Sequence, residues 1–362
     1  MLSRNAKLAG VVLAGAVFLS ACGDPDANGT GSSANSDISC ATGDLKGAGS
    51  TFQKNIVAQW IKDYTAACAD ATVDYQGIGS GAGIQQFGSA TIDLAGSDSA
   101  MKDEEQAAAD KRCGTPAIHL PITAGGIAIA YKLDGVESLQ LSPSTAAGIF
   151  TGTIKNWDDA AIKAENPGTT LPSTAITPVH REDSSGTTDV FSKFLAKTAG
   201  PAWSLGTGKE LDWPASVQGA KGSDGVTQAA ASTEGGVTYT ELSYVETGGL
   251  EAAKVKNGAG EYTALEAAGV TTALAGSTLP STGTDLKVSY DYANATAGAY
   301  PITAVSYAIV CSKGTPAAKL ALLKSFLTYA AGDGQASAKD VGYAPLPPAL
   351  AQRVTTTISG LS

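Results

Sequence analysis

The sequence has 362 residues, which exceeds a typical single domain and predicts two lobes within one molecule. Its 34 acidic and 24 basic residues give a formal net charge of −10 at pH 7. A surface this acidic argues against nucleic-acid binding and gives no long-range attraction for anions, so a bound anion would have to be held by local donors.

The N-terminus has the pattern of an export signal. Arg4 and Lys7 precede an apolar run, residues 8–19, that is too short to span a bilayer comfortably. The run ends in Leu-Ser-Ala-Cys at Cys22, which resembles the lipobox of bacterial lipoproteins. That resemblance implies a signal peptide at residues 1–21, a lipid on Cys22 and an exported protein anchored at the outer face of the cytoplasmic membrane. A plain secretory signal is the alternative.

Residues 22–43 are rich in Gly, Ser, Asn and Asp, and we expect a flexible tether. Four cysteines remain after Cys22, and an even number in an exported protein favours two disulfides, for which three pairings are open. Cys40 precedes the first expected strand and Cys68 ends the first expected helix, so we favour this pair. Cys113 would then pair with Cys311. A zinc site is disfavoured, since there is no C-x-x-C motif and only two histidines.

Three strand–turn–helix units open the mature domain. The expected strands begin at residue 45 and cover 72–76 and 92–95, and the expected helices cover 56–64, 84–87 and 103–111. Repeated units of this kind predict a mostly parallel α/β sheet, in which ligands bind beyond the carboxyl ends of the strands. The loops that carry Ser50, Ser80 and Asp98 should therefore lie at one edge.

The apolar run 117–131, interrupted by Pro121 and a Gly pair, suits a strand that leaves one lobe and enters the other. The later expected helices are 143–157, broken by Gly152, then 158–163, 225–232, 262–268 and 316–331, and the later expected strands are 176–179, 237–245 and 304–310. At 237–245 a bent segment is the alternative. We expect the strand at 304–310 to cross back and the helix at 316–331 to pack on the first lobe.

Residues 179–188, Val-His-Arg-Glu-Asp-Ser-Ser-Gly-Thr-Thr, directly precede a helical apolar pattern. Unpaired N–H groups and the positive end of the dipole at a helix N-terminus form an anion site. The residues around Ser50 and Ser80 also precede helices, and Arg181 adds charge, so we predict an oxyanion site. Asp98 would repel an anion unless the ligand carries a proton that Asp98 accepts.

Three enzyme or cofactor patterns compete with this prediction. Residues 77–82 match a dinucleotide fingerprint with Asp98 about 20 residues further on, but its specificity is low in a glycine-rich exported chain. A serine-hydrolase elbow at Ser80 lacks its first glycine, and His119 and His180 have no triad context, so we expect both histidines to be structural. No carboxylate pair stands out for a glycosidase.

Four ordered motifs together resemble the phosphate-binding lipoproteins of high-affinity phosphate ABC importers, with an actinobacterial character. They are residues 47–52, 75–83, 96–98 and 180–187, and residues 152–157, 300–302 and 345–348 extend the likeness over nearly the whole mature chain. The resemblance implies an α/β, two-lobed periplasmic-binding-protein fold of type II, with the ligand cleft between the lobes at a hinge. We expect lobe I at 44–123 and 303–362 and lobe II at 124–302.

The resemblance also implies site residues and partners. The implied phosphate-binding residues are Ser50, Thr51, Phe52, Ser80, Asp98, Arg181, Ser185, Gly186 and Thr187. Asp98 would accept the phosphate proton and Asp183 would orient Arg181, while Ser184 stands where the family often has glycine. The implied partners are inorganic phosphate, the permease and ATPase subunits of an importer, and the membrane through lipid on Cys22.

We expect a monomer without nucleic acid, metal, cofactor or catalytic activity. An exported phosphohydrolase and a binder of another tetrahedral oxyanion are the alternatives.

Overall fold

The computed structural model describes residues 38–280 and 282–362. The predicted signal peptide, the lipidation site at Cys22 and most of the predicted tether lie outside these residues. Gly43, the last residue of the predicted tether, is the first residue of strand β1 (Gly43–Gly49). In the described ranges, no helix combines the length and apolar composition that a membrane span requires.

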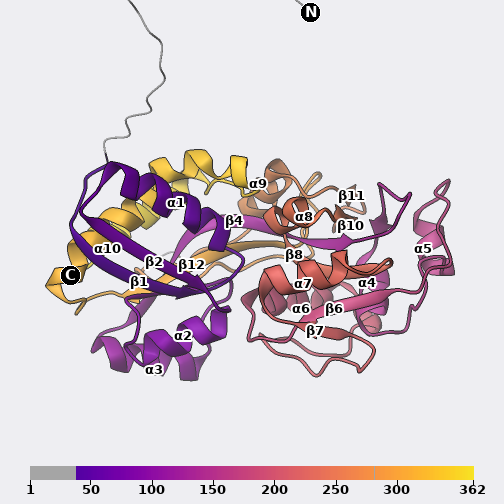
Figure 1. Ribbon diagram of the computed structural model, residues 1–362, viewed down its shortest axis with the longest axis horizontal. Coiled ribbons are helices and arrows are strands. Elements are labelled where there is room, and N and C mark those ends of the chain that lie inside the picture. Colours follow the sequence, from indigo (N-terminus) through magenta and orange to yellow (C-terminus); the bar gives the residue numbers. More distant parts are fainter. Residues whose placement is uncertain (1–37, 281) are drawn as a thin grey trace, which may run out of the picture. The chain divides into compact units, whose positions relative to one another are not determined.

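Three parallel strands form the first part of the main sheet, in the order β2-β1-β3. The elements are β1, α1 (Lys54–Ala67), β2 (Ala71–Gly77), α2 (Ser80–Gly88), β3 (Leu94–Ser97) and α3 (Asp103–Cys113). Helix α1 buries Ile56, Trp60 and Tyr64 at four-residue spacing, which is the apolar stripe of a helix on a sheet. Figure 1 shows α1 above these strands and α2 and α3 below them. The three predicted strand–helix units are confirmed.

Strand β4 (Ala117–Tyr131) is buried along its whole length and joins two groups of strands. Residues 117–126 pair antiparallel with β12 (Thr303–Cys311), and residues 127–131 pair antiparallel with β8 (Gly236–Glu241). Between these two parts, a Cβ on Gly126 would come within 2.1 Å of the Leu265 side chain, which therefore packs directly against the backbone at this glycine. The predicted strand at 117–131 and the return strand at 304–310 are both confirmed.

The second group continues the main sheet as β8, β6 (Thr177–Arg181) and β7 (Gln218–Ala220), with β6 parallel to both neighbours. Its helices are α4 (Pro143–Phe150), α5 (Ala160–Glu165), α6 (Gly186–Thr198), η1 (Gly200–Ala202), α7 (Gly222–Ala231) and α8 (Leu242–Gly248). We call the part built on β1, β2 and β3 the first lobe and the part built on β6, β7 and β8 the second lobe. Figure 1 shows β4 running between them.

A small sheet in the order β11-β10-β5 and a short strand beside β4 complete the strands described. These elements and the helix that follows are β5 (Gln140–Leu141), β9 (Glu251–Ala252), β10 (Lys254–Lys256), β11 (Tyr262–Thr263) and α9 (Ala267–Ala275). The predicted helix at 262–268 is wrong in its first half. Tyr262 and Thr263 pair with β10, and the helix begins only at Ala267.

Two other predicted boundaries are also wrong. The helix expected over 143–157 ends at Phe150 and Gly152 follows at a φ of +72°, so the predicted break at Gly152 is confirmed and the helical continuation to 157 is wrong. The strand expected over 237–245 ends at Glu241, whose carboxylate accepts a hydrogen bond from the Ser243 N–H and caps α8. The bent segment considered for this stretch is therefore correct.

The C-terminal helices belong to the first lobe. They are α10 (Ala317–Ala331), η2 (Asp333–Ser337), η3 (Lys339–Val341) and α11 (Pro348–Ser359). Helix α10 packs on β1 and α1, as predicted, and α11 packs on α10. Tyr64 of α1 and Phe326 of α10 meet edge to face with ring centroids 5.5 Å apart.

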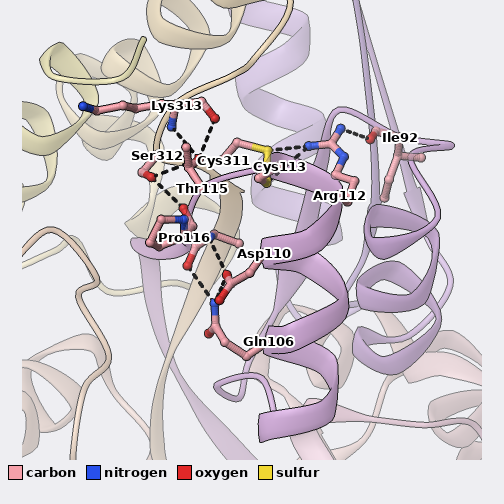
Figure 2. The surroundings of a disulfide bond; sticks show 11 residues. Ile92, Gln106, Asp110, Arg112, Cys113, Thr115, Pro116, Cys311, Ser312 and Lys313 are labelled. Carbon is pink, nitrogen blue, oxygen red and sulfur yellow. Dashed lines mark hydrogen bonds between the residues drawn. A yellow bond between two sulfur atoms is a disulfide. The ribbon is translucent and has the colours of Figure 1, made fainter.

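Two disulfides hold the first lobe together, and both have the favoured pairing. Cys40 bonds to Cys68 at the end of α1, and Cys113 at the end of α3 bonds to Cys311 at the end of β12. Figure 2 shows the second bond with the Arg112 side chain directed at it. Arg112 donates to the Cys311 sulfur at 2.7 Å and to the Ile92 carbonyl at 2.9 Å. This disulfide therefore ties a helix close to the start of the fold to a strand near its end.

Candidate anion-binding site

The loops that carry the predicted site residues meet where the two lobes contact each other. From the first lobe come the loop after β1, the start of α2 and the residue after β3, and from the second come the end of β6 and the start of α6. The structure brings all the predicted phosphate-binding residues into this region, and every one of them is buried.

The loop after β1 is fixed by tyrosine hydroxyls. Tyr75 donates to the carbonyl of Ser50 at 2.9 Å, and Tyr244 donates to the carbonyl of Thr51 at 2.7 Å. Tyr343 donates to the carbonyl of Phe52 at 2.5 Å. In a trans peptide the N–H points away from the preceding C=O, so fixing the first two carbonyls directs the N–H groups of the next two residues to the opposite side. Burial raises the pKa of each of these tyrosines, which keeps them neutral donors.

Several buried N–H groups of the site have no acceptor among the residues that the structure describes. They belong to Thr51, Phe52, Ser80, Gly186 and Thr187. Leaving a buried donor unpaired costs about 1–3 kcal/mol, so groups of this kind gather where a ligand completes them. The first turns of α2 and α6 supply three of the five, together with the positive ends of their helix dipoles.

Asp98 is the buried carboxylate of the site. Its Oδ1 accepts hydrogen bonds from the hydroxyls of Ser50 and Ser306 (2.7 Å for Ser306), and its Oδ2 accepts one from Thr187 at 3.1 Å. Burial raises the pKa of Asp98 above its ordinary value, while these hydroxyls and the Arg181 guanidinium act in the opposite direction. The Ser50 hydroxyl is therefore directed to Asp98, whereas the sequence predicted it as a donor to the ligand.

Arg181 is held in place by Asp183. Its Nε and Nη2 donate to the two carboxylate oxygens at 2.6 and 2.5 Å, which is the bidentate geometry of a strong ion pair. Burial alone would raise the pKa of Asp183, but Arg181 and the Gly222 N–H hold it below its ordinary value. This bidentate contact is the geometry that the predicted orienting role of Asp183 would need. Nη1 lies 3.5 Å from the hydroxyl of Ser223.

The start of α6 approaches the first lobe so closely that only glycine fits at one position. A Cβ on Gly186 would lie 2.6 Å from the Ser80 hydroxyl and 2.9 Å from the Asp98 backbone nitrogen. The Ser185 hydroxyl caps the helix by accepting from the Thr188 N–H at 3.2 Å. The Ser184 carbonyl accepts from the Gly81 N–H at 2.9 Å, a backbone bond between the lobes that does not depend on the side chain at this position.

The lobes make direct contacts on both sides of the site. Thr51 and Ser223 join their hydroxyls at 2.8 Å. The buried Lys209 bonds both carboxylate oxygens of Glu105, at 2.8 and 2.6 Å. The chain is therefore in a closed arrangement.

The geometry of the glycine loop differs from what a dinucleotide site needs. A Cβ on Gly79 would lie 2.4 Å from the Asp183 carboxylate, and one on Gly81 would lie 2.2 Å from the Ser184 hydroxyl. These glycines therefore make room for the second lobe, whereas in a dinucleotide site they would make room for a pyrophosphate.

Each histidine has a structural contact. His119 accepts from the Met101 N–H at 3.0 Å, and His180 stacks on Trp213. Within residues 38–280 and 282–362, no group of three or more His, Cys, Asp or Glu residues could hold a metal ion.

Ser223, Ser306 and the tyrosines Tyr75, Tyr244 and Tyr343 are site residues that the sequence did not indicate. Ser306 had one weak signal, because it is a polar residue inside the apolar run 304–310. The tyrosines come from β2, from α8 and from the loop before α11, so no local pattern could have linked them.

Comparison with known proteins gives the same fold and a family. A model of the PBP superfamily domain matches residues 30–333. The phosphate-binding protein PstS 3 of Mycobacterium tuberculosis is 38% identical over 370 aligned positions, which cover 100% of both chains.

Solved structures also match. A high-affinity periplasmic phosphate-binding protein bound with phosphate, PfluDING, has a TM-score of 0.70 at 23% identity over 87% of this chain and 93% of its own. An ABC-type phosphate transport receptor from Vibrio cholerae has a TM-score of 0.54 at 16% identity over 84% of this chain and 100% of its own. The two-lobed periplasmic-binding-protein fold is thus confirmed, and the chain belongs to the PstS family of phosphate-binding proteins within the PBP superfamily.

Proposed function

We propose that this protein captures inorganic phosphate outside the cell and delivers it to the permease of an ABC importer. The observation that carries the proposal is a set of buried N–H groups, unpaired among the residues that the structure describes, which lie with Arg181 and Asp98 where the two lobes meet. The full-length PstS relative and the Vibrio cholerae transport receptor support the same function.

The donors suit a tetrahedral oxyanion. Backbone N–H groups of Thr51, Phe52, Ser80, Gly186 and Thr187 would donate to the phosphate oxygens, and the Arg181 guanidinium would supply charge. The hydroxyls of Thr51, Ser80 and Ser185 would add further donors. Taking a phosphate out of water is costly, and several aligned donors with one guanidinium are the usual compensation.

Asp98 would determine which anion binds. Phosphate at neutral pH keeps at least one proton, which a carboxylate can accept, whereas sulfate has none. Sulfate would therefore bring a second negative charge against Asp98 in a buried site, at a cost of several kcal/mol.

We also propose the surroundings in which the protein works. Lobe I at 44–123 and 303–362 and lobe II at 124–302 would open and close around phosphate, and closure would be the signal to the permease. A lipid on Cys22 would anchor the monomer at the outer face of the cytoplasmic membrane through the tether at 22–43. Binding and release would leave phosphate chemically unchanged, without cofactor or metal.

Titration calorimetry of the purified protein with phosphate, sulfate and molybdate tests the proposal. Phosphate should bind, and sulfate should bind at least about a hundredfold more weakly. Equal affinity for sulfate would refute the role of Asp98, and absence of phosphate binding would refute the function. Turnover of a generic phosphoester would favour the phosphohydrolase alternative.

A further inference from the structure

The two oxygens of the Asp98 carboxylate have different numbers of donors. Oδ1 accepts from the hydroxyls of Ser50 and Ser306, while Oδ2, as far as residues 38–280 and 282–362 show, accepts from Thr187 alone. A carboxylate oxygen has two lone pairs in its plane, so Oδ1 is filled and Oδ2 retains one. The proton of a bound phosphate therefore has only Oδ2 to go to.

Ser306 reaches Asp98 because of an irregularity in its strand. It lies on β12, fully buried, where the pairing with β4 shifts register between Ser306 and Tyr307. Tyr307 is paired with Ser97, the last residue of β3, and Asp98 directly follows that strand. Shifts of this kind redirect a side chain, and here the serine hydroxyl is directed at the carboxylate.

Several other charged and titratable groups lie around Asp98. Arg181 lies on β6 and Tyr75 on β2, and a cavity of about 300 Å³ beside Asp98 is lined by Asp189, Lys193, Tyr290, Tyr292 and Tyr307. Burial raises the pKa of every one of these tyrosines, and Asp189 and Lys193 are paired at 2.6 Å. Among these groups, Asp98 is therefore the one whose protonation would change the acceptors offered to the ligand.

We propose that Ser306, together with Ser50, is a positioning residue that keeps Asp98 ionised and reserves Oδ2 for the proton of the ligand. This inference rests on the proposed function and deepens it, because it assigns selectivity for protonated oxyanions to two hydroxyls that do not need to touch the ligand. A protonated Asp98 would donate a hydrogen bond, and a sulfate oxygen could accept it. Sulfate would then bind. The hydroxyls on Oδ1 therefore act against sulfate through Asp98.

The test is the pH dependence of anion binding in Ser306→Ala. A hydrogen bond to a charged group, once lost, should raise the pH at which sulfate begins to bind by about one unit. The phosphate-to-sulfate affinity ratio at pH 7 should fall about tenfold, measured by calorimetry from pH 5 to 8. Ser50→Ala, which removes the other donor to the same oxygen, should move both values in the same direction and serves if Ser306→Ala folds poorly.

Thr303→Val is the matched control. Thr303 is buried on the same strand, but its hydroxyl bonds the Tyr300 carbonyl at 2.9 Å and does not touch Asp98. The control should keep the wild-type ratio and pH profile. In an Asp98→Asn background, Ser306→Ala should have no further effect on the ratio, because the residue acts through Asp98.

The outcomes separate the inference from the function beneath it. If the wild type binds phosphate but Ser306→Ala and Ser50→Ala keep its ratio and pH profile, the inference is overturned and the function stands. A change in Thr303→Val equal to that in Ser306→Ala would also overturn it, because packing would then explain both. If the wild type binds no phosphate, the function and the inference fall together.

Discussion

Lys209 bridges the lobes from a buried position, and its removal should weaken phosphate binding. Its ammonium bonds both oxygens of Glu105 on α3, with 4% of the lysine side chain and 21% of the glutamate side chain exposed. Its carbonyl accepts the Ser185 N–H at 3.0 Å, so the same residue is tied to the start of α6. An ion pair that joins the lobes contributes only when they are closed, and we expect it to stabilise the bound form.

The magnitude follows from what Lys209→Met leaves behind. Breaking a fully buried pair costs about 3–5 kcal/mol. Glu105 is partly exposed and sits in the first turn of α3, where the helix dipole favours a negative charge, so we expect about 2 kcal/mol. That corresponds to a phosphate Kd about thirtyfold higher. Calorimetry gives the Kd, and stopped-flow kinetics should show that the change lies mainly in faster dissociation.

Lys54 offers a matched comparison, because its ion pair with Asp224 also joins the lobes but is exposed, at 41% and 64%. Lys54→Met should change the Kd by less than about fivefold, as exposed pairs contribute at most about 1 kcal/mol. Adding Glu105→Gln to Lys209→Met should restore part of the affinity, since the loss comes from an uncompensated carboxylate. Equal effects of Lys209→Met and Lys54→Met would refute the reasoning.

Three further predictions concern single groups. Asp98→Asn should lower the phosphate-to-sulfate affinity ratio by at least about tenfold at pH 7, and an unchanged ratio in calorimetry would contradict the proton-acceptor role. Burial raises the pKa of Glu241 to about 8, so the folded state holds a proton that the unfolded state releases above about 4.5. The stability contribution of Glu241 should therefore fall as pH rises from about 4.5 to 8. Thermal melts of Glu241→Gln should lose this part of the pH dependence, and parallel curves for variant and wild type would refute it. Replacing Cys113 and Cys311 by serine should cost about 2–5 kcal/mol of unfolding free energy in denaturant titrations, because their sequence separation is 198 residues; a loss below about 1 kcal/mol would contradict this.

Local patterns were sufficient to locate the loops of the site. The alternation of short strands and amphipathic helices over the first 70 residues of the domain predicts a parallel sheet, and a parallel sheet places its loops at one edge. The apolar run 117–131 predicted a strand shared by the lobes, which the pairing of β4 with both β12 and β8 confirms. These signals are local or depend only on periodicity, so one sequence is enough to read them.

Local patterns did not predict the groups that orient the site. The bend at Glu241 depends on a side-chain cap that competes with a run of alternating residues suited to a strand. Ser306 depends on a register shift between β12 and β4, and a one-residue shift changes which side chains face the site. Composition and spacing gave only weak signals of either effect, because both depend on contacts made in the folded chain.

The tyrosine hydroxyls link closure of the lobes to the orientation of the binding loop. Tyr75 and Tyr343 belong to the first lobe and fix the carbonyls of Ser50 and Phe52 within it. Tyr244 lies on α8, which packs on α7 of the second lobe, and donates to the carbonyl of Thr51. Because that carbonyl and the Phe52 N–H share one peptide plane, the orientation of this donor is completed only when Tyr244 reaches the loop. If the lobes opened, Tyr244 would move away from the Thr51 carbonyl and this peptide could rotate. Opening would therefore remove the donors of the second lobe and also weaken the Phe52 N–H as a donor in the first lobe.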